Sequence, residues 1–323
     1  MQADAARVPS SPSPSLTHYF RFHGTGGELF VLILKNLFFT VCTLGIYAAW
    51  AKAARRQFIW NNTEISGQRL SFTGTGLELF KGYLKLLGLY LLVVAAPFAV
   101  EKLIPGTHVA AQVVLVVLVI ALLPFAIYAS RAYLLSRTEW RGVRFGLVPG
   151  AGLFARTFFL GLLLTVLTLG LYGPVWTNRL RRILVSNMRY GTEPFVYSGT
   201  DGEAFRIGVK GFVLTVLTLG IYSFWYQAQM QRFVVGNTSL MGARGHSTLS
   251  AGDFFAFMLL GGLGLVFSLG LAFPWVLVYI LSTTMERLTF EGPIDFALIK
   301  QREKAGDAMS DALASELGVD LAL

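Results

Sequence analysis

Three lysines occupy matched places in the chain, each seven residues after an acid, and they are the first candidates for chemistry. The pairs are Glu28 with Lys35, Glu78 with Lys85 and Glu203 with Lys210. Seven residues are about two turns of an α-helix, so the acid and the lysine would share one helix face. Ionisable groups within apolar helices are costly and often functional. We therefore hypothesise that these intramembrane lysines point toward a common interior, with the acids near its mouth. Lysines that extend outward to lipid headgroups are the alternative.

The acids also have an interpretation as helix caps. A hydroxyl residue stands three positions ahead of each acid in the pairs Thr25 and Glu28, Thr75 and Glu78, Thr200 and Glu203, and Ser250 and Asp253. This is the spacing of a capping box, in which the hydroxyl and the acid each bind a free backbone N–H group. Capping predicts these residues without any catalytic role, and the acid would repel a phosphate group at the same place.

A third group of charges closes the apolar runs. These candidate contacts to lipid headgroups are Arg55, Arg56, Arg179, Arg181, Arg182 and Arg232. The formal net charge of +9 would suggest nucleic acid as a partner of a soluble protein. Basic residues beside apolar runs are instead typical of membrane proteins, where they set topology and contact anionic lipids. We expect a lipid bilayer with anionic lipids as partner, and no nucleic acid.

The sequence carries no motif of an enzyme or a metal site. Its four histidines lack the spacing of a zinc site, and neither a G-x-S-x-G turn nor a G-x-x-x-x-G-K-[ST] phosphate loop occurs. A single cysteine excludes a disulfide within one chain. We expect no catalytic residue, no cofactor and no metal, and a protein that is not an enzyme.

Apolar helices are the elements that would position these charges. Hydrophobic residues make up 54% of the chain and charged residues 14%, against roughly 25% charged residues in a soluble domain. Crossing the hydrocarbon of a bilayer takes ~20 residues in a helix. Six runs meet that length and are expected to be the principal spans: 29–50, 79–100, 109–130, 155–176, 207–226 and 254–281.

The chain also repeats itself. The segment NTEISGQRLSFTGTGLELF (62–80) returns as NMRYGTEPFVYSGTDGEAF (187–205), and TLGIYAAW (43–50) returns as TLGIYSFW (218–225). A fixed period indicates stacked structural units, here about 28–77, 78–152, 153–202, 203–252 and 253–300. They form a membrane domain over 19–300, after a disordered Ser/Pro-rich tail (1–18). A polar tail, with a helix as an alternative, follows at 301–323.

Each unit ends in a pattern typical of a β-hairpin. Residues 69–73 alternate in polarity, and Gly67, Gly142 and Gly242 stand at turn positions. The predicted fold class is therefore an α-helical polytopic integral membrane protein, built from about five internal repeats, with short β-hairpins outside the membrane.

Two arrangements of the helices remain open. Single spans would place successive repeats in opposite orientations, a pattern seen in transporters. A helical hairpin bent at the TLG sequence of each unit would place almost every Lys and Arg on one side, as the positive-inside rule favours. The legs of the short units are slightly too short for a full crossing, so such hairpins would be partly re-entrant. In both arrangements the termini share one side, which we expect to be the cytosol.

At these motifs the chain resembles a known family. TLGIYxxW at 43–50 and 218–225, NTxxxG at 62–67 and 237–242, and FTGTGLELF at 72–80 are similar to those of the bacterial inner-membrane proteins of domain-of-unknown-function family 898, the YjgN-like proteins. The second unit departs from the pattern, since it has neither TLG nor a capping acid. The resemblance implies a multi-pass protein of the bacterial inner membrane and supplies no activity.

Two functions fit these observations, ahead of a lipid-modifying enzyme, for which no acid–base or metal constellation appears. Permeation or transport of a small solute or ion would use the repeats, the aligned lysines and the glycine bends. A non-enzymatic scaffold or envelope-homeostasis protein that binds anionic lipid would use the stacking of units alone.

Overall fold

The computed structural model describes residues 17–294, 296 and 299, and its strands close into an antiparallel barrel. The strands are β1 (Thr17–Phe22), β2 (Thr63–Ile65), β3 (Gln68–Phe72), β4 (Thr138–Trp140), β5 (Val143–Leu147), β6 (Met188–Tyr190), β7 (Glu193–Tyr197), β8 (Thr238–Leu240), β9 (Ala243–Ser247) and β10 (Leu288–Glu291). They follow one another round the barrel in chain order, and β1 pairs with both β2 and β10 to close it. The tail predicted at 301–323, and all but the end of the tail predicted at 1–18, lie outside the described residues.

Two-residue turns join the strands into hairpins. Ser66 and Gly67, between β2 and β3, have φ angles of 49° and 78°, and the turns at Arg141–Gly142 and Met241–Gly242 have the same pattern. Positive φ at both central residues is the signature of a type I′ turn, which favours glycine. The β-hairpins predicted at the turn glycines Gly67, Gly142 and Gly242 are therefore confirmed. Hydrogen bonds between successive hairpins, such as β3 with β4 and β5 with β6, build the barrel that the sequence did not predict.

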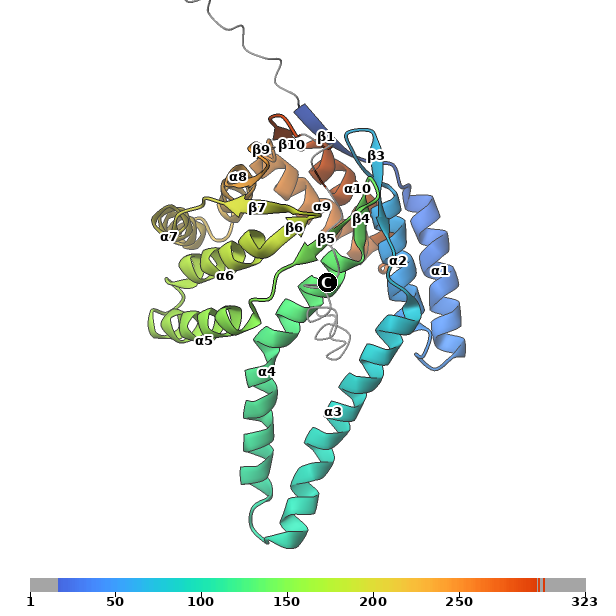
Figure 1. Cartoon of the computed structure of the whole chain (residues 1–323), viewed down its shortest axis with the longest axis vertical. Helices are drawn as coiled ribbons and strands as arrows, with labels where there is room; N and C mark the ends of the chain where they lie inside the picture. The colour runs from blue at the N-terminus through green and yellow to red at the C-terminus, as the bar shows by residue number, and fades with distance from the viewer. Residues whose placement is uncertain (1–16, 295, 297–298, 300–323) are drawn as a thin grey trace, which may run out of the picture.

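A pair of helices follows each hairpin or the first strand. The helices are α1 (Gly26–Cys42), α2 (Ala48–Asn61), α3 (Gly76–Leu103), α4 (His108–Ser136), α5 (Ala151–Leu167), α6 (Gly173–Asn187), α7 (Asp201–Leu217), α8 (Ser223–Gly236), α9 (Ala251–Phe267) and α10 (Phe273–Glu286). Each helix contacts the next along the chain and α10 contacts α1, so the helices form a closed ring. The second helix of each pair also contacts the barrel, α2 through β3 and α4 through β5 (Figure 1).

Caps start several of these helices where the sequence predicted them. The Thr25 hydroxyl accepts a hydrogen bond from the Glu28 N–H at 3.3 Å, and the Glu28 carboxylate accepts one from the Thr25 N–H at 3.0 Å. The same reciprocal box forms between Thr75 and Glu78, and between Ser250 and Asp253. At α7 the structure shows only the hydroxyl half, from Thr200 to the N–H of Glu203.

A left-handed turn interrupts four of the six runs expected to be spans, at TLG in three of them and at SLG in the last. Leu44 and Gly45, with φ angles of 50° and 93°, reverse the chain between α1 and α2, and Leu169, Leu219 and Leu269 have the same conformation. The helices on either side of these turns have 14–17 residues. The structure thus shows the helical hairpin that the sequence left open, and six straight spans are wrong.

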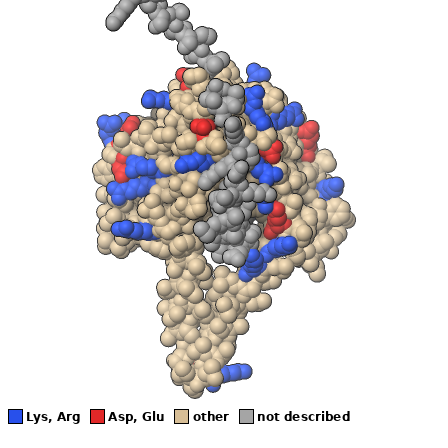
Figure 2. Space-filling view, in the orientation of Figure 1, with Lys and Arg blue, Asp and Glu red and all other residues tan. Residues whose placement is uncertain are grey.

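The second helix pair differs from the others in length. α3 and α4 have 28 and 29 residues, and they are the helices of the described chain that are long and apolar enough to cross a membrane. They project beyond the other helices (Figure 1), and Figure 2 shows their projecting part almost without charged side chains, with basic colour only at its far end. The predicted fold class is therefore corrected: the chain is a closed β-barrel ringed by mostly short helices, not a polytopic helical membrane protein.

Aromatic and aliphatic side chains fill the barrel at the ends of its hairpins. Trp140, Tyr190 and Leu240, the last residues of β4, β6 and β8, are buried together with Ile299. The Tyr190 hydroxyl donates a hydrogen bond to the carbonyl oxygen of Trp140 at 2.8 Å. Because strand residues alternate between faces, the neighbours of these positions lie outside and the lumen is a packed core at this end.

Candidate functional site: a basic cavity beside the barrel

A cavity of about 510 Å³ lies where α2, α4 and α6 approach the barrel. Basic side chains from all three helices line it: Lys52, Arg55 and Arg56 of α2, Arg131 of α4 and Arg181 of α6. Apolar side chains complete most of the wall, with Ile59, Trp60, Leu134, Leu135, Leu147, Leu184, Val185 and Met188. No Asp or Glu is among the described residues of the lining. We name this space the basic cavity.

Three of the arginines hold the same position in successive helix pairs. Arg56 lies seven residues ahead of Thr63, Arg131 seven ahead of Thr138 and Arg181 seven ahead of Met188, and each of these later residues begins the strand that follows. Seven residues are about two helical turns. The three arginines therefore hold equivalent positions on their helices, and the Arg181 side chain also forms a hydrogen bond with the buried Tyr197. In the last two helix pairs, α7–α8 and α9–α10, the same position holds Gln231 and Leu281. An arginine at this position therefore occurs in the first three pairs alone.

The wall of the cavity is fixed by contacts between helices and strands. The Trp60 Nε1 atom donates a hydrogen bond to the Thr138 hydroxyl at 2.8 Å. Arg56 is only 6% exposed, and its guanidinium lies 5.9 Å from the centre of the Phe72 ring. A guanidinium within ~6 Å of an aromatic face is attracted to it. The site is thus built before any ligand arrives.

Other predicted arginine contacts form ion pairs outside this lining. Arg179 Nε and Arg182 Nη2 bind the two carboxylate oxygens of Asp201 at 2.6 and 2.9 Å. Burial alone would raise the pKa of Asp201, but hydrogen bonds from Arg179 and Asn178 outweigh it and lower the pKa below its usual value. Arg232 is exposed on α8. The structure thus brings three of the six predicted arginines, Arg55, Arg56 and Arg181, into one cavity.

The predicted lysine site does not form. Lys35, Lys85 and Lys210 are all exposed, so the expectation that they are buried in a common interior is wrong. The helical period explains the error. A spacing of seven residues puts the lysine on the same helix face as the capping acid, and a capping acid such as Glu28 is exposed. The acids lie at the helix starts, where Glu78 also binds Arg137, with 3.1 Å between Oε1 and Nη2.

Two residues of the basic cavity were missed by the sequence analysis. Lys52 was not distinguished from its neighbours, and Arg131 lies in the unit that departs from the TLG pattern. Its signal was its distance to the following strand, because Arg131 precedes the TEW strand by the same interval that separates Arg181 from Met188. The sequence alone could not show that α2, α4 and α6 are close together.

A second cavity, of about 350 Å³, adjoins the basic cavity through two shared residues. Lys52 and Arg55 line both spaces, and the second is otherwise formed by α1, the start of α2 and Tyr83 of α3. Ile33, Leu37, Ala48 and Ala51 give it a mainly apolar surface, to which Asn36 and Thr40 of α1 add two polar side chains. We name it the side cavity.

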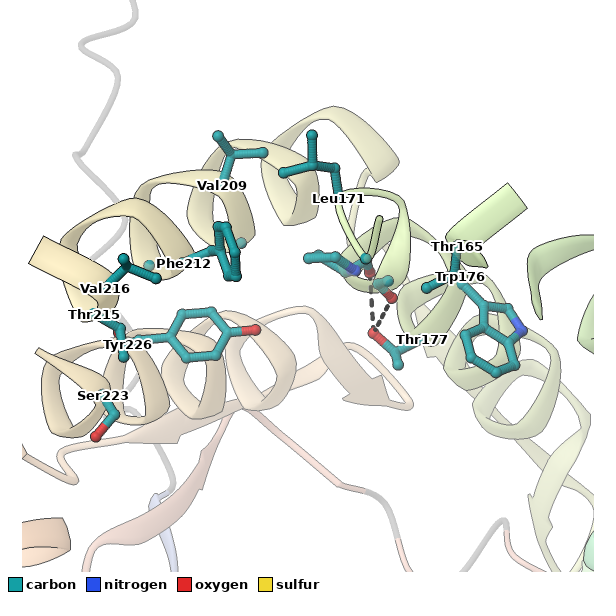
Figure 3. A pocket seen from close by; sticks show the side chains of 15 residues that line it. Thr165, Leu171, Trp176, Thr177, Val209, Phe212, Thr215, Val216, Ser223 and Tyr226 are labelled. Carbon is teal, nitrogen blue, oxygen red and sulfur yellow. Dashed lines mark hydrogen bonds between the residues drawn. The ribbon is translucent and has the colours of Figure 1, made fainter. Parts of the chain in front are cut away.

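A third cavity, of about 490 Å³, lies between α5–α6 and α7–α8 (Figure 3) and has a different character. Its lining contains no charged side chain among the described residues. The Thr177 hydroxyl points to the carbonyl oxygens of Gly173 and Pro174, at 3.0 and 3.1 Å (Figure 3). The Thr177 donor is therefore used within α6, and the described lining offers an anion no charged partner.

The described residues contain no cluster of three or more His, Cys, Asp or Glu side chains that could hold a metal ion. The basic cavity has the opposite chemistry. Guanidinium groups donate hydrogen bonds, accept none and stay protonated, so they bind carboxylates and phosphates rather than cations.

Comparison with known proteins identifies the family. The family described as "Bacterial protein of unknown function (DUF898)" matches residues 17–201, 192–244 and 224–316. The chain belongs to this family. The resemblance of its TLG, NTxxxG and GTGxELF motifs is thereby confirmed, and the DUF898 match covers the helices that line the basic cavity.

Curated relatives of this DUF898 chain carry the name "Inner membrane protein YjgN". The protein from Escherichia coli (strain K12) is 31% identical over 151 residues, which are 46% of this chain and 36% of the relative. The protein from Salmonella typhimurium is 33% identical over 129 residues, 40% of this chain and 31% of the relative. The chain thus matches about a third of the length of these relatives. No solved structure matches it.

Proposed function

We propose that this protein is a non-enzymatic protein of the bacterial inner membrane that binds an anionic ligand in its basic cavity. The observation that carries the proposal is the convergence of Arg56, Arg131 and Arg181, from three separate helices, on one space. Guanidinium groups are the usual protein ligands of carboxylates and phosphates, so a space lined by arginines from three helices is suited to an anion. A cavity of this size is in the range of small-molecule sites, roughly 300–1,000 Å³.

The membrane location rests on the relatives and on the apolar surface. The relatives are named inner membrane proteins, and α3 and α4 are long enough to cross a bilayer. The tips of the shorter helix pairs add apolar side chains, since Leu44, Leu169, Leu219 and Leu269 are each at least 90% exposed. In this proposal α3 and α4 cross the bilayer, the shorter tips enter its surface, and both termini are cytosolic.

Binding is favoured over catalysis by the composition of the cavity. General acid–base catalysis needs a group that gains and loses a proton near neutral pH, whereas four of the five charged residues of the lining are arginines. Permeation is the weaker alternative, because the exposed lysines remove the aligned charges on which it rested.

The test is thermal unfolding of the detergent-purified full-length protein with inorganic pyrophosphate at constant ionic strength. We expect pyrophosphate to raise the Tm, since a ligand that binds only the folded state stabilises it. Arg131→Gln and Arg181→Gln should weaken the apparent affinity by about tenfold each, which corresponds to ~1.4 kcal/mol. The matched control is Arg232→Gln, an exposed arginine of α8 outside the cavity.

The outcome that contradicts the proposal is a Tm shift that is equal in the wild type and in the cavity variants. Pyrophosphate would then act as a general salt, and the basic cavity would not be its site. Absence of any shift at millimolar pyrophosphate would contradict the proposal as well.

A further inference from the structure

The side cavity gives the basic cavity an apolar extension. Lys52 and Arg55 form the border between the two spaces. On one side of this border are the arginines of α4 and α6, and on the other are Ile33, Leu37 and Ala51 of the first helix pair. A ligand that fills both spaces therefore has a negatively charged end and an apolar end.

The outer end of the side cavity meets the apolar surface of α1. Leu37 lines the cavity and is also 55% exposed. Leu34, Phe38 and Val41, its neighbours on α1, are more than half exposed too. An exposed apolar surface of this kind marks contact with a membrane or another apolar partner. An acyl chain can thus reach the side cavity from lipid without passing through water.

From this geometry we infer that the ligand of the basic cavity is an anionic lipid with a phosphate headgroup. Its headgroup lies among Arg55, Arg131 and Arg181, and its acyl chain enters through the side cavity between α1 and α3. The inference rests on the proposed function, since it names the class of ligand that the same site takes.

The arginines placed around the headgroup, Arg55, Arg131 and Arg181, favour a headgroup with more than one negative charge. Five basic residues line the basic cavity, and an arginine binds the oxygens of a phosphate through paired hydrogen bonds. A phosphate monoester carries close to two negative charges at neutral pH, as a phosphorylated side chain does. A zwitterionic headgroup would instead place a positive charge beside Arg131 and Arg181.

The experiment compares three probes on the purified full-length protein by native mass spectrometry and by thermal unfolding. They are dioctanoyl phosphatidic acid, inorganic phosphate and dioctanoyl phosphatidylcholine. Phosphatidic acid and inorganic phosphate share the anionic group but differ in the acyl chains, so they separate a lipid from a soluble anion. We expect phosphatidic acid to bind at least tenfold more tightly than either of the others.

Two variants test the path of the acyl chain. Ala51→Leu fills part of the side cavity, and Leu37→Ser makes its outer edge polar. Each should reduce the advantage of phosphatidic acid over inorganic phosphate severalfold and leave the Tm shift with pyrophosphate unchanged. That unchanged shift also shows that the variant is folded and that the basic cavity is intact.

The results distinguish the two levels of the proposal. If phosphatidic acid binds no more tightly than inorganic phosphate while pyrophosphate still requires Arg131 and Arg181, the ligand is a soluble anion and the lipid inference is wrong. If phosphatidylcholine binds as tightly as phosphatidic acid, the site binds acyl chains without selecting an anionic headgroup, and the inference is again wrong. If none of the anions depends on Arg131 or Arg181, the proposed function itself fails.

Discussion

The indole Nε1 atom of Trp60 and the hydroxyl of Thr138 form a hydrogen bond of 2.8 Å between residues that are 78 positions apart. Trp60 belongs to α2, and Thr138 is the first residue of β4. Thr138 in turn donates to the carbonyl oxygen of Leu134 at 2.8 Å. This chain of bonds links the first helix pair to the strand that follows the second pair, at the wall of the basic cavity.

Replacing Trp60 by Phe should destabilise the protein by about 1 kcal/mol, the usual contribution of one such hydrogen bond. The Thr138 hydroxyl is almost buried, at 8% exposure, so water replaces the lost donor poorly. Trp225→Phe is the matched control, because Trp225 is 51% exposed. Thermal unfolding in detergent measures the difference, and equal Tm values for both variants would show that the bond carries no net stability.

A second prediction concerns the contact between α3 and α2. A Cβ atom on Gly76 would lie 2.4 Å from the Trp50 ring and 2.7 Å from the Trp50 Cα atom. Gly76→Ala should therefore cost ~1–3 kcal/mol, the usual range for overpacking. Gly88→Ala in the same helix is the control, since nothing lies within 4 Å of its Cβ position. Helix propensity predicts that this control is neutral or stabilising by up to ~1 kcal/mol.

Local features of this fold follow from local sequence. The capping pairs, such as Thr25 with Glu28, and the I′ turns, such as Ser66–Gly67, depend on residues within three positions of each other. Their geometry is therefore visible in the sequence. Closure of the barrel was not, because the pairing of Phe72 with Thr138 joins strands separated by two long helices. Strands of three to six residues carry too few side chains to specify a partner by pattern.

The misreading of the spans has a physical reason as well. The run 29–50 is continuous in hydrophobicity, yet Leu44 has a φ of 50° and is 95% exposed. A leucine in the left-handed region is unusual, so Leu44 does not indicate a turn. The local sign of the reversal is the glycine that follows, Gly45. The basic cavity was not predicted from the sequence for a similar reason. Arg56, Arg131 and Arg181 lie far apart in the chain, and only the ring of helices brings them to one cavity.

A third prediction concerns acid stability. Hydrogen bonds and charge from Arg179, and a bond from Asn178, hold the pKa of Asp201 below its usual 3.8 in the folded protein. A lowered folded pKa means that Asp201 contributes stability above pH 3.8, and that this contribution is lost as the pH falls through the folded pKa. Asp201→Asn should therefore lower the Tm at pH 7 and should differ less from the wild type near pH 3.

The control for this prediction is Glu203→Gln. Glu203 lies in the same first turn of α7, and the described residues show no ion pair to it. The Tm gap between this variant and the wild type should be smaller at pH 7. A gap for Asp201→Asn that stays constant from pH 7 to pH 3 would mean that the ion pairs with Arg179 and Arg182 add no stability.

The last prediction concerns how α3 and α4 lie in the membrane. If both helices cross and the termini are cytosolic, as proposed, the loop between the helices faces the periplasm and the chain returns to the cytosolic side. A reporter that is active only in the periplasm should therefore be active when fused after Gly106 and inactive at Leu323. The Glu101 carboxylate accepts hydrogen bonds from the Gly106 and His108 N–H groups at 2.9 and 2.7 Å, so this tip is a folded turn that a fusion extends outward. A cytosolic reporter provides the reciprocal control at both positions. Activity of the periplasmic reporter at Leu323, or its absence at both sites, would contradict the crossing.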